Sequence, residues 1–383
     1  PMLCQQFLIE ALARRKSKHT YRSLSLNSHL IDFTSNDYLG FASSPELRKE
    51  YITKLHAIES LGATGSRLLT GHSQLCQRIE EQLAAYHNFE SCLIFNTGYT
   101  ANLGLLYALA TDQDRILHDL YIHASIYDGI RLSKAQSFPF NHNDLNHLEK
   151  RLASSHLGRT FVCVESVYSL HGSVAPLQAI SELCERYSAY LIVDEAHAVG
   201  VFGDQGEGLV SALGLQDKVL ATVYTFGKAL GTHGAAIAGS SILKDYLINF
   251  CRPFIYTTAQ PPHALTAIEL AYEHNQRAFN QREHLSALIH HFREKAQNLG
   301  LQLMKDNTTT PIQSICVSGS HRARQAALQI QNSGYDVRPI VSPTVKQREE
   351  LLRICLHAFN TKNEIDHLLH TLEQIFLCNV SSL

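Results

Sequence analysis

The chain has 383 residues, of which 45% are hydrophobic and 18% are charged, and its formal net charge is −2. These values are ordinary for a globular protein large enough to form two domains. A nucleic-acid partner is not expected, because there is no basic excess and no stripe of Arg or Lys interleaved with aromatic residues. No run reaches the roughly 18 apolar residues of a membrane span, so no membrane partner is expected either.

Cysteine usage and the N-terminal residues indicate a cytoplasmic protein. The nine cysteines are scattered, without a C-x-x-C pair, which suits reduced thiols better than disulfides or zinc. The histidines 284, 290 and 291 lack the i,i+4 spacing of a helical metal site, so no metal is expected. Residues 1–20 read as an amphipathic helix with a basic end and lack the apolar core of a signal peptide.

Short apolar, β-branched runs alternate with helical patterns through most of the chain. The helical pattern over 180–189 is one example. The expected strands are 91–96, 115–119, 160–166, 189–196 and 221–226, with 235–240 returning antiparallel. This alternation predicts an α/β fold, with a mainly parallel sheet covered by helices on both faces and ligands at the carboxyl ends of the strands.

The pattern changes after residue 275. One long amphipathic helix, 280–303, is followed by apolar runs at 311–317, 335–341 and 351–359, separated by shorter helices. The sequence therefore predicts an N-terminal helix and arm over 1–45, a large domain over 46–275 and a smaller C-terminal α/β domain over 276–383.

The stretch "AYLIVDEAHAVGVFG", residues 189–203, has two incompatible interpretations. An apolar strand ending in Asp-Glu-Ala-His is typical of nucleotide-driven motors, but these also need a G-x-x-x-x-G-K-[ST] loop. The only Gly-Lys pair is Gly227-Lys228, which Ala229 follows. The motor is therefore disfavoured, and Asp194 and His197 are expected to serve another cofactor.

Lys228 lies just beyond the expected strand 221–226, in a glycine-rich turn. A partly desolvated lysine amine loses its proton readily and can hold an aldehyde cofactor as a Schiff base. The alternative is a solvated loop lysine. A pyridoxal phosphate site also needs a carboxylate against the pyridine nitrogen, and Asp194, at the end of a strand, can supply it.

Two strand-to-helix junctions offer the remaining contacts of such a cofactor. In "LYIHASIYDG", His123 can stack on the ring, or it can simply cap a helix. In "FNTGYTANLG", Thr97, Gly98 and Tyr99 open a helix whose N-terminal N–H groups favour a phosphate. The alternative there is an ordinary strand-to-helix turn.

Blocks along nearly the whole chain together resemble the α-oxoamine synthases, which are fold-type I pyridoxal phosphate enzymes that condense an amino acid with an acyl thioester. The resemblance implies a seven-stranded, mainly parallel sheet, pyridoxal 5'-phosphate as cofactor, and a homodimer with shared active sites. The blocks are "FTSNDYLGFA" (33–42), "GATGSRLLTGH" (62–72), "FNTGYTANLG", "HASIYDG", "VDEAHAVGVFGDQGEG" (193–208), "TFGKALGTHGAA" (225–236), "YTTAQPP" (256–262) and "LLRICLHAFN" (351–360).

The resemblance implies a role for each matching residue. Lys228 carries the cofactor and moves a proton, Asp194 partners the ring nitrogen, and His123 stacks on the ring. The other implied cofactor contacts are His197 and Ser169 on the phenolic side, Thr225 with the Gly98 and Tyr99 amides at the phosphate, and Thr257 or Thr258 reaching the phosphate of the other subunit.

The resemblance also implies substrate contacts. Asn36 and Arg353 match residues that bind the amino acid's carboxylate, for which a guanidinium is well shaped. Glu165 is a candidate acid near the condensing carbonyl, or a strand-end carboxylate paired with a base. Arg22 is the candidate contact for the far end of the acyl chain, or a solvated charge.

The expected substrates are L-alanine and a pimeloyl thioester of CoA or of acyl carrier protein. The alternatives are a sibling reaction such as glycine with acetyl-CoA, and a non-catalytic partner subunit of the same fold. One departure bears on the acyl substrate: the family usually has Met-Asp-Gly-Asp where this chain has Leu170-His171-Gly172-Ser173.

Overall fold

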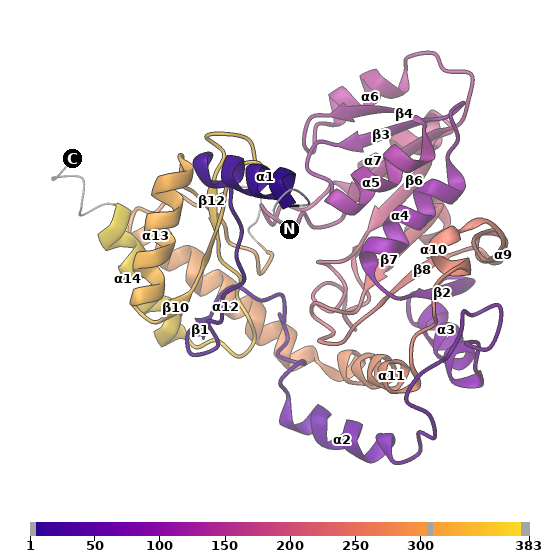
Figure 1. The fold of residues 1–383 in the computed structure, drawn as a ribbon, viewed down its shortest axis with the longest axis horizontal. Helices are drawn as coiled ribbons and strands as arrows, with labels where there is room; N and C mark the ends of the chain where they lie inside the picture. Colours follow the sequence, from indigo (N-terminus) through magenta and orange to yellow (C-terminus); the bar gives the residue numbers. More distant parts are fainter. Residues whose placement is uncertain (1–4, 305–308, 377–383) are drawn as a thin grey trace. The chain divides into compact units, whose positions relative to one another are not determined.

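The computed structural model describes residues 5–304 and 309–376 (Figure 1). Contacts between Cα atoms divide the chain into two compact units. The large unit comprises residues 36–169 and 173–283, and the small unit comprises the described residues of 1–35, 170–172 and 284–383. The units divide after residues 35 and 283, whereas the domain boundaries after residues 45 and 275 remain predictions from the sequence pattern.

The large unit is built on a seven-stranded sheet with the order β2-β8-β7-β6-β5-β3-β4. Every strand is parallel to its neighbours except β8, which is antiparallel to β2 and β7. The predicted mainly parallel seven-stranded sheet and its antiparallel return are therefore confirmed. The strands are β2 (Ser91–Phe95), β3 (Arg115–Asp119), β4 (Gln136–Phe140), β5 (Thr160–Glu165), β6 (Tyr190–Asp194), β7 (Ala221–Thr225) and β8 (Ala235–Gly239).

Burial explains which of these strands can be recognised in the sequence. Strands β2, β3, β5, β7 and β8 are buried along their whole length, and a strand buried on both faces reads as a continuous apolar run. Strand β4 was missed. It is an edge strand, exposed or half-buried except at Phe140, and it contains Pro139, which is tolerated at a sheet edge but carries no strand signal.

Helices cover both faces of this sheet (Figure 1). One face packs on α4, α5, α9 and α10, and the other packs on α3 and α11 at one end and on α6, α7 and α8 at the other. The helices of the large unit are α2 (Pro45–Leu55), α3 (Gln74–Tyr86), α4 (Gly98–Leu109), α5 (Ala124–Ser133), α6 (Leu145–Leu152), α7 (Leu177–Arg186), α8 (Leu209–Ala212), the 3-10 helix η2 (Gln216–Lys218), α9 (Ser241–Phe250), α10 (Arg252–Ile255) and α11 (Pro262–Arg277).

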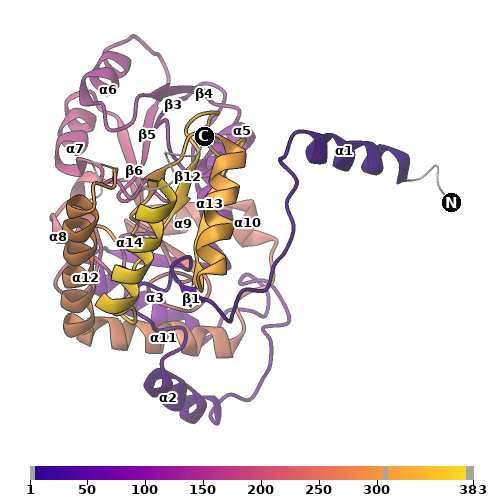
Figure 2. The same cartoon turned by 90° about the vertical axis from the view of Figure 1, so that its left-hand side faces the viewer.

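Helix α12 (Phe279–Asn298) continues the chain into the small unit and corresponds to the long helix expected there. In the small unit β1 pairs in parallel with β10, and β11-β12-β9 form an antiparallel sheet. Figure 2 shows α13 and α14, which are in contact, side by side. The elements are α1 (Gln6–Ser17), β1 (Ile31–Asp32), β9 (Ile315–Cys316), α13 (Ser320–Asn332), β10 (Tyr335–Asp336), β11 (Arg338–Ile340), β12 (Leu351–Arg353) and α14 (Lys362–Phe376).

Helix α1 has the predicted basic end, with Arg14, Arg15 and Lys16 in its last turn, and none of its residues is buried. Among the described residues, no helix has both the length and the apolar character that crossing a bilayer requires.

Candidate active site

A cavity of about 220 Å³ opens at the carboxyl ends of the sheet strands in the large unit. Parallel strands deliver the residues that follow them to one edge of the sheet, which is why motifs far apart in sequence meet there. Its lining includes ten of the predicted site residues, namely Asn36, Thr97, Gly98, Tyr99, His123, Glu165, Asp194, His197, Thr225 and Lys228. Sequence reasoning gave no role to Asn102, Ser125 and His233, which also line it.

The N-terminus of α4 forms an anion-binding cradle. Thr97 is the N-cap, and its Oγ1 accepts from the Thr100 N–H at 3.1 Å. A Cβ on Gly98 would lie 2.4 Å from Cγ2 of Thr225, so only glycine lets the backbone approach so closely. Oγ1 of Thr225 is buried and has no hydrogen-bond partner among the described residues. This orphaned hydroxyl beside a helix N-terminus fits a phosphate group.

Asp194, the last residue of β6, provides a fixed buried carboxylate. Its side chain accepts two hydrogen bonds. The Ala196 N–H donates to Oδ1 at 2.9 Å, and Nδ2 of Asn102 donates to Oδ2 at 2.7 Å. Only 5% of Asp194 is exposed. A buried carboxylate held in this way suits a protonated ring nitrogen, because buried charges need an opposite charge.

His123 both caps a helix and lines the cavity, so capping is confirmed and stacking on a cofactor ring stays a prediction. Its Nδ1 accepts from the Ser125 N–H at 3.2 Å, as the N-cap of α5. Oγ of Ser125 lies 2.8 Å from the same Nδ1 and accepts from Nδ2 of Asn102 at 3.0 Å. Asn102 therefore connects Ser125, which bonds to His123, with Asp194. Asn102 and Asp194 are 92 residues apart, and no local sequence pattern encodes their contact.

Burial lowers the pKa of His123, the positive charge of Lys228 lowers it further, and the negative charge of Asp194 opposes both. The lowered pKa favours the neutral imidazole at pH 7. Lys228 occupies the turn directly after β7, where its backbone oxygen accepts from the Gly231 N–H at 2.8 Å. Its amine belongs to the same lining as Asp194 and His123.

Glu165, the last residue of β5, adds a buried carboxyl to the cavity. Only 2% of this residue is exposed, and its Oε1 has no hydrogen-bond partner among the described residues. Burial raises the pKa of Glu165 well above its usual range, and the charge of Asp194 raises it further. A carboxyl kept neutral in this way can donate a proton to a ligand.

Five predicted residues are not among those lining the cavity. Of the two threonines, Thr257 accepts through Oγ1 from Nδ2 of Asn96 at 3.2 Å, and Thr258 accepts through its backbone oxygen from the same amide at 2.8 Å. Ser169 lies in the large unit as well. Arg22 and Arg353 belong to the small unit. Arg22 donates to Oγ1 of Thr344 at 3.4 Å, and Arg353 donates to the backbone oxygen of Thr34 at 3.5 Å.

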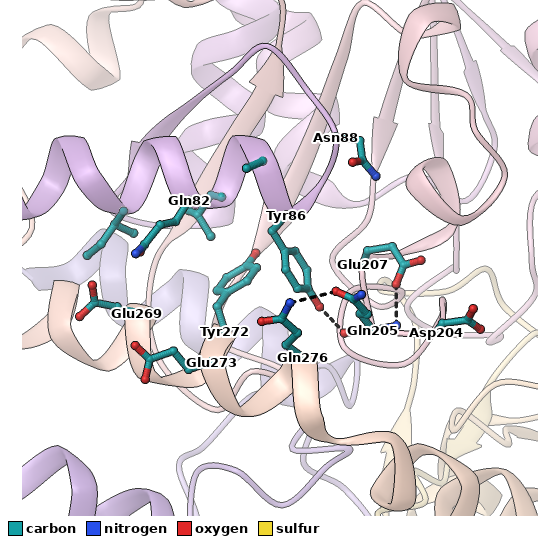
Figure 3. A pocket seen from close by; sticks show the side chains of 13 residues that line it. Gln82, Tyr86, Asn88, Asp204, Gln205, Glu207, Glu269, Tyr272, Glu273 and Gln276 are labelled. Carbon is teal, nitrogen blue, oxygen red and sulfur yellow. Dashed lines mark hydrogen bonds between the residues drawn. The ribbon is translucent and has the colours of Figure 1, made fainter.

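A larger cavity of about 580 Å³ lies elsewhere in the large unit, beside α3 and α11 (Figure 3). Its carboxylates are partly neutralised, since Lys54 pairs with Glu273 at 3.1 Å and Arg78 pairs with Glu269 at 3.0 Å. None of the predicted site residues lines it. The smaller cavity is the candidate active site because it gathers an amine, a buried carboxylate and an anion cradle.

Comparison with known proteins identifies the family of the chain. A family model described as aminotransferase class I and II matches residues 28–372. The chain belongs to this family. Its relatives include an 8-amino-7-oxononanoate synthase from Emericella nidulans that is 39% identical, with 97% of this chain and 96% of the relative covered. The predicted resemblance to the α-oxoamine synthases is thereby confirmed.

Solved structures extend the comparison to the fold and the cofactor. The crystal structure of the 8-amino-7-oxononanoate synthase from Francisella tularensis is 30% identical, with a TM-score of 0.79 over 90% of this chain and 97% of that one. A high-resolution structure of SPT, a serine palmitoyltransferase, with the PLP internal aldimine is 25% identical, with a TM-score of 0.88 over 98% of each chain. The chain is a pyridoxal phosphate-dependent transferase of fold-type I, as predicted.

Proposed function

We propose that this enzyme condenses L-alanine with a pimeloyl thioester of CoA or acyl carrier protein. The products are 8-amino-7-oxononanoate, the released carrier and CO2, in biotin biosynthesis. The observation that carries the proposal is that Lys228, Asp194 and His123 line one cavity together with the anion cradle at the start of α4. The names of relatives such as the Emericella nidulans enzyme support the choice of reaction.

Each cavity residue then has a task in that reaction. The cofactor supplies an electron sink that makes the amino acid's Cα–H acidic. The Lys228 amine would hold the cofactor's aldehyde until the amine of the amino acid replaces it, and the freed Lys228 amine would then take up the Cα proton. Asp194 keeps the cofactor's ring nitrogen protonated, and the neutral His123 imidazole packs against the ring. Gly98, Tyr99 and Thr225 hold the phosphate.

Substrate contacts follow the same logic. Asn36 binds the amino acid's carboxylate, for which its amide N–H groups are suitable donors. The protonated Glu165 donates to the acyl carbonyl oxygen as the new carbon–carbon bond forms, supported by its raised pKa and its Oε1 atom without a partner. The family resemblance assigns Arg353 to the same carboxylate and Arg22 to the distal end of the acyl chain. His197 and Ser169 contact the phenolic side of the cofactor.

The proposal includes a homodimer with shared active sites. Thr257 or Thr258 would reach the phosphate of the partner subunit, which is consistent with their absence from the cavity of their own chain. Mixing a Lys228→Ala chain with a chain altered at Thr257 and Thr258 would then restore one intact site per mixed dimer. We also place the enzyme in the cytoplasm, which the free thiols of the buried cysteines support.

The decisive experiment measures CoA release with every pairing of L-alanine, glycine and L-serine against pimeloyl-, acetyl-, succinyl- and palmitoyl-CoA, with the product identified by mass spectrometry. L-alanine with the pimeloyl donor is expected to give the highest kcat/KM. If glycine with acetyl-CoA is faster, the enzyme is a 2-amino-3-ketobutyrate ligase. A purified protein without a visible cofactor band after incubation with pyridoxal phosphate would instead be a non-catalytic partner subunit.

A further inference from the structure

Tyr38 joins two residues of the active-site cavity without lining the cavity itself. Its side chain is completely buried, at 0% exposed. Its hydroxyl oxygen lies 3.1 Å from Oδ1 of Asn36 and 2.8 Å from Nδ1 of His197. Both neighbours line the cavity, so one hidden phenol is bonded to two groups that a ligand would meet.

The chemistry of the three groups determines which atom donates in each bond. A phenol has a single hydrogen, and the amide oxygen of Asn36 can only accept, so Tyr38 donates to Asn36. The phenol oxygen then accepts a hydrogen bond from the N–H at Nδ1 of His197. In the neutral imidazole the proton is thus fixed on Nδ1, and Nε2 is the acceptor.

The same bond determines which end of the Asn36 amide a ligand encounters. Because Tyr38 holds Oδ1, the amide cannot rotate by half a turn without losing this bond. What Asn36 offers a ligand therefore comes from Nδ2, which only donates. A carboxylate only accepts, so Tyr38 maintains the amide orientation that a carboxylate requires.

His123, another of the histidines that line the cavity, has the opposite arrangement. Nδ1 of His123 accepts from the Ser125 N–H at 3.2 Å, so the proton of its neutral ring is on Nε2. His123 therefore has a donor Nε2, whereas His197 has an acceptor Nε2. The hydrogen bond at Nδ1 determines which nitrogen carries the proton: Ser125 makes this bond to His123, and Tyr38 makes it to His197.

We propose that Tyr38 is a positioning residue for the amino acid substrate: it holds the Asn36 amide with its N–H groups toward the substrate carboxylate and fixes the proton of His197 on Nδ1. The proposal rests on the proposed function only in requiring a substrate with a carboxylate. Tyr38 touches neither substrate nor cofactor and acts through Asn36 and His197.

The test is Tyr38→Phe, which removes the hydroxyl and keeps the ring in the core. Without the phenol, the Asn36 amide no longer has a preferred orientation and His197 no longer has a fixed tautomer. The dissociation constant of L-alanine, titrated through the cofactor's absorbance with no acyl donor present, is expected to rise about fivefold to fiftyfold. The KM of the acyl donor is expected to stay within about twofold, because Tyr38 acts on the amino acid only.

The matched control is Tyr272→Phe. Tyr272 is also buried, at 7% exposed, and its hydroxyl lies 2.9 Å from Nε2 of the buried His87, but neither residue lines the active-site cavity. Both substitutions remove one buried tyrosine–histidine hydrogen bond, and Tyr38→Phe also removes the bond to Asn36, so both are expected to lower Tm. Only Tyr38→Phe is expected to weaken L-alanine binding. If both variants weaken it equally, the effect is a general loss of structure and the proposal is wrong.

A double-mutant cycle tests whether Tyr38 acts through Asn36. In an Asn36→Ala background, Tyr38→Phe is expected to weaken binding by less than about twofold, because the amide that it orients is gone. An undiminished effect in that background would overturn the proposal. If the wild type binds glycine or L-serine but not L-alanine, the substrate of the proposed function is wrong, and the Tyr38 comparison is decided with the amino acid that binds, since all share the carboxylate.

Discussion

Asp194→Asn is the most informative perturbation of the cavity, because it removes a charge and almost no volume. The carboxylate now accepts from the Ala196 N–H at 2.9 Å and from Nδ2 of Asn102 at 2.7 Å. In the variant the amide oxygen has to remain at the Ala196 N–H, which needs an acceptor. The new NH2 group then faces the NH2 group of Asn102, and two donors meet where a charged hydrogen bond was.

Two losses follow from this geometry. An opposite charge about 4 Å from a carboxylate in a partly screened site contributes about 4 kcal/mol, which corresponds to about a thousandfold in rate. Asn102 can avoid the donor–donor contact by turning its amide, but it then loses its 3.0 Å bond to Oγ of Ser125, at a cost of about 1 kcal/mol. We therefore expect exchange of the L-alanine Cα hydrogen to slow by about a hundredfold to ten-thousandfold.

The assay is deuterium incorporation at Cα of L-alanine in D2O, followed by NMR, with cofactor occupancy measured by absorbance on the same sample. Occupancy is expected to change less than the exchange rate, because the anion cradle is intact. Asp114→Asn is the control. Asp114 is equally buried, at 2% exposed, and is paired with Arg159 outside the cavity. An Asp194→Asn variant that is fully loaded and exchanges at the wild-type rate would refute the assignment of Asp194 to the ring nitrogen.

Three further predictions concern the cofactor link, the acyl substrate and pH. Lys228→Ala is expected to abolish turnover while the protein still binds the cofactor non-covalently, and borohydride should label the Lys228 peptide in the wild type only; a label on another lysine contradicts the site. Arg22→Ala is expected to raise the KM of the pimeloyl donor by about twofold to tenfold, since Arg22 is exposed, and to leave L-alanine binding unchanged; an unchanged KM removes Arg22 from the site. Burial raises the pKa of Glu195 to about 7, so the folded state retains a proton that the unfolded state releases, and stability is expected to fall as pH rises from about 4.5 to about 7. Glu195→Gln should flatten this part of the Tm-against-pH curve, although it lowers Tm overall because the carboxyl accepts from the Leu209 and Val210 N–H groups at 2.8 and 2.7 Å; an unchanged pH dependence would show that Glu195 does not titrate in this range.

The sequence by itself determined six of the seven sheet strands of the large unit and the residues at their carboxyl ends. Strands such as β5 and β7 are buried along their whole length and are mostly apolar, so they can be recognised as apolar runs in the sequence. Asp194 ends a strand and His123 and Lys228 lie within four residues after one, and parallel strands bring such positions to one edge. Their meeting in one cavity could therefore be predicted without coordinates.

Only the tertiary structure decided what holds these residues in place. Asn102 bonds to Asp194 across 92 residues and Tyr38 to His197 across 159 residues, and no spacing rule in the sequence connects such pairs. The pairing of β1 with β10 likewise depends on long-range contact, from Ile31 to Tyr335. The edge strand β4 could not be recognised in the sequence, because most of its residues are exposed or half-buried and do not have to be apolar. Local chemistry is encoded in adjacent residues, but the direction of each hydrogen bond and the protonation of Glu165 and His123 depend on burial and on neighbours that folding alone brings together.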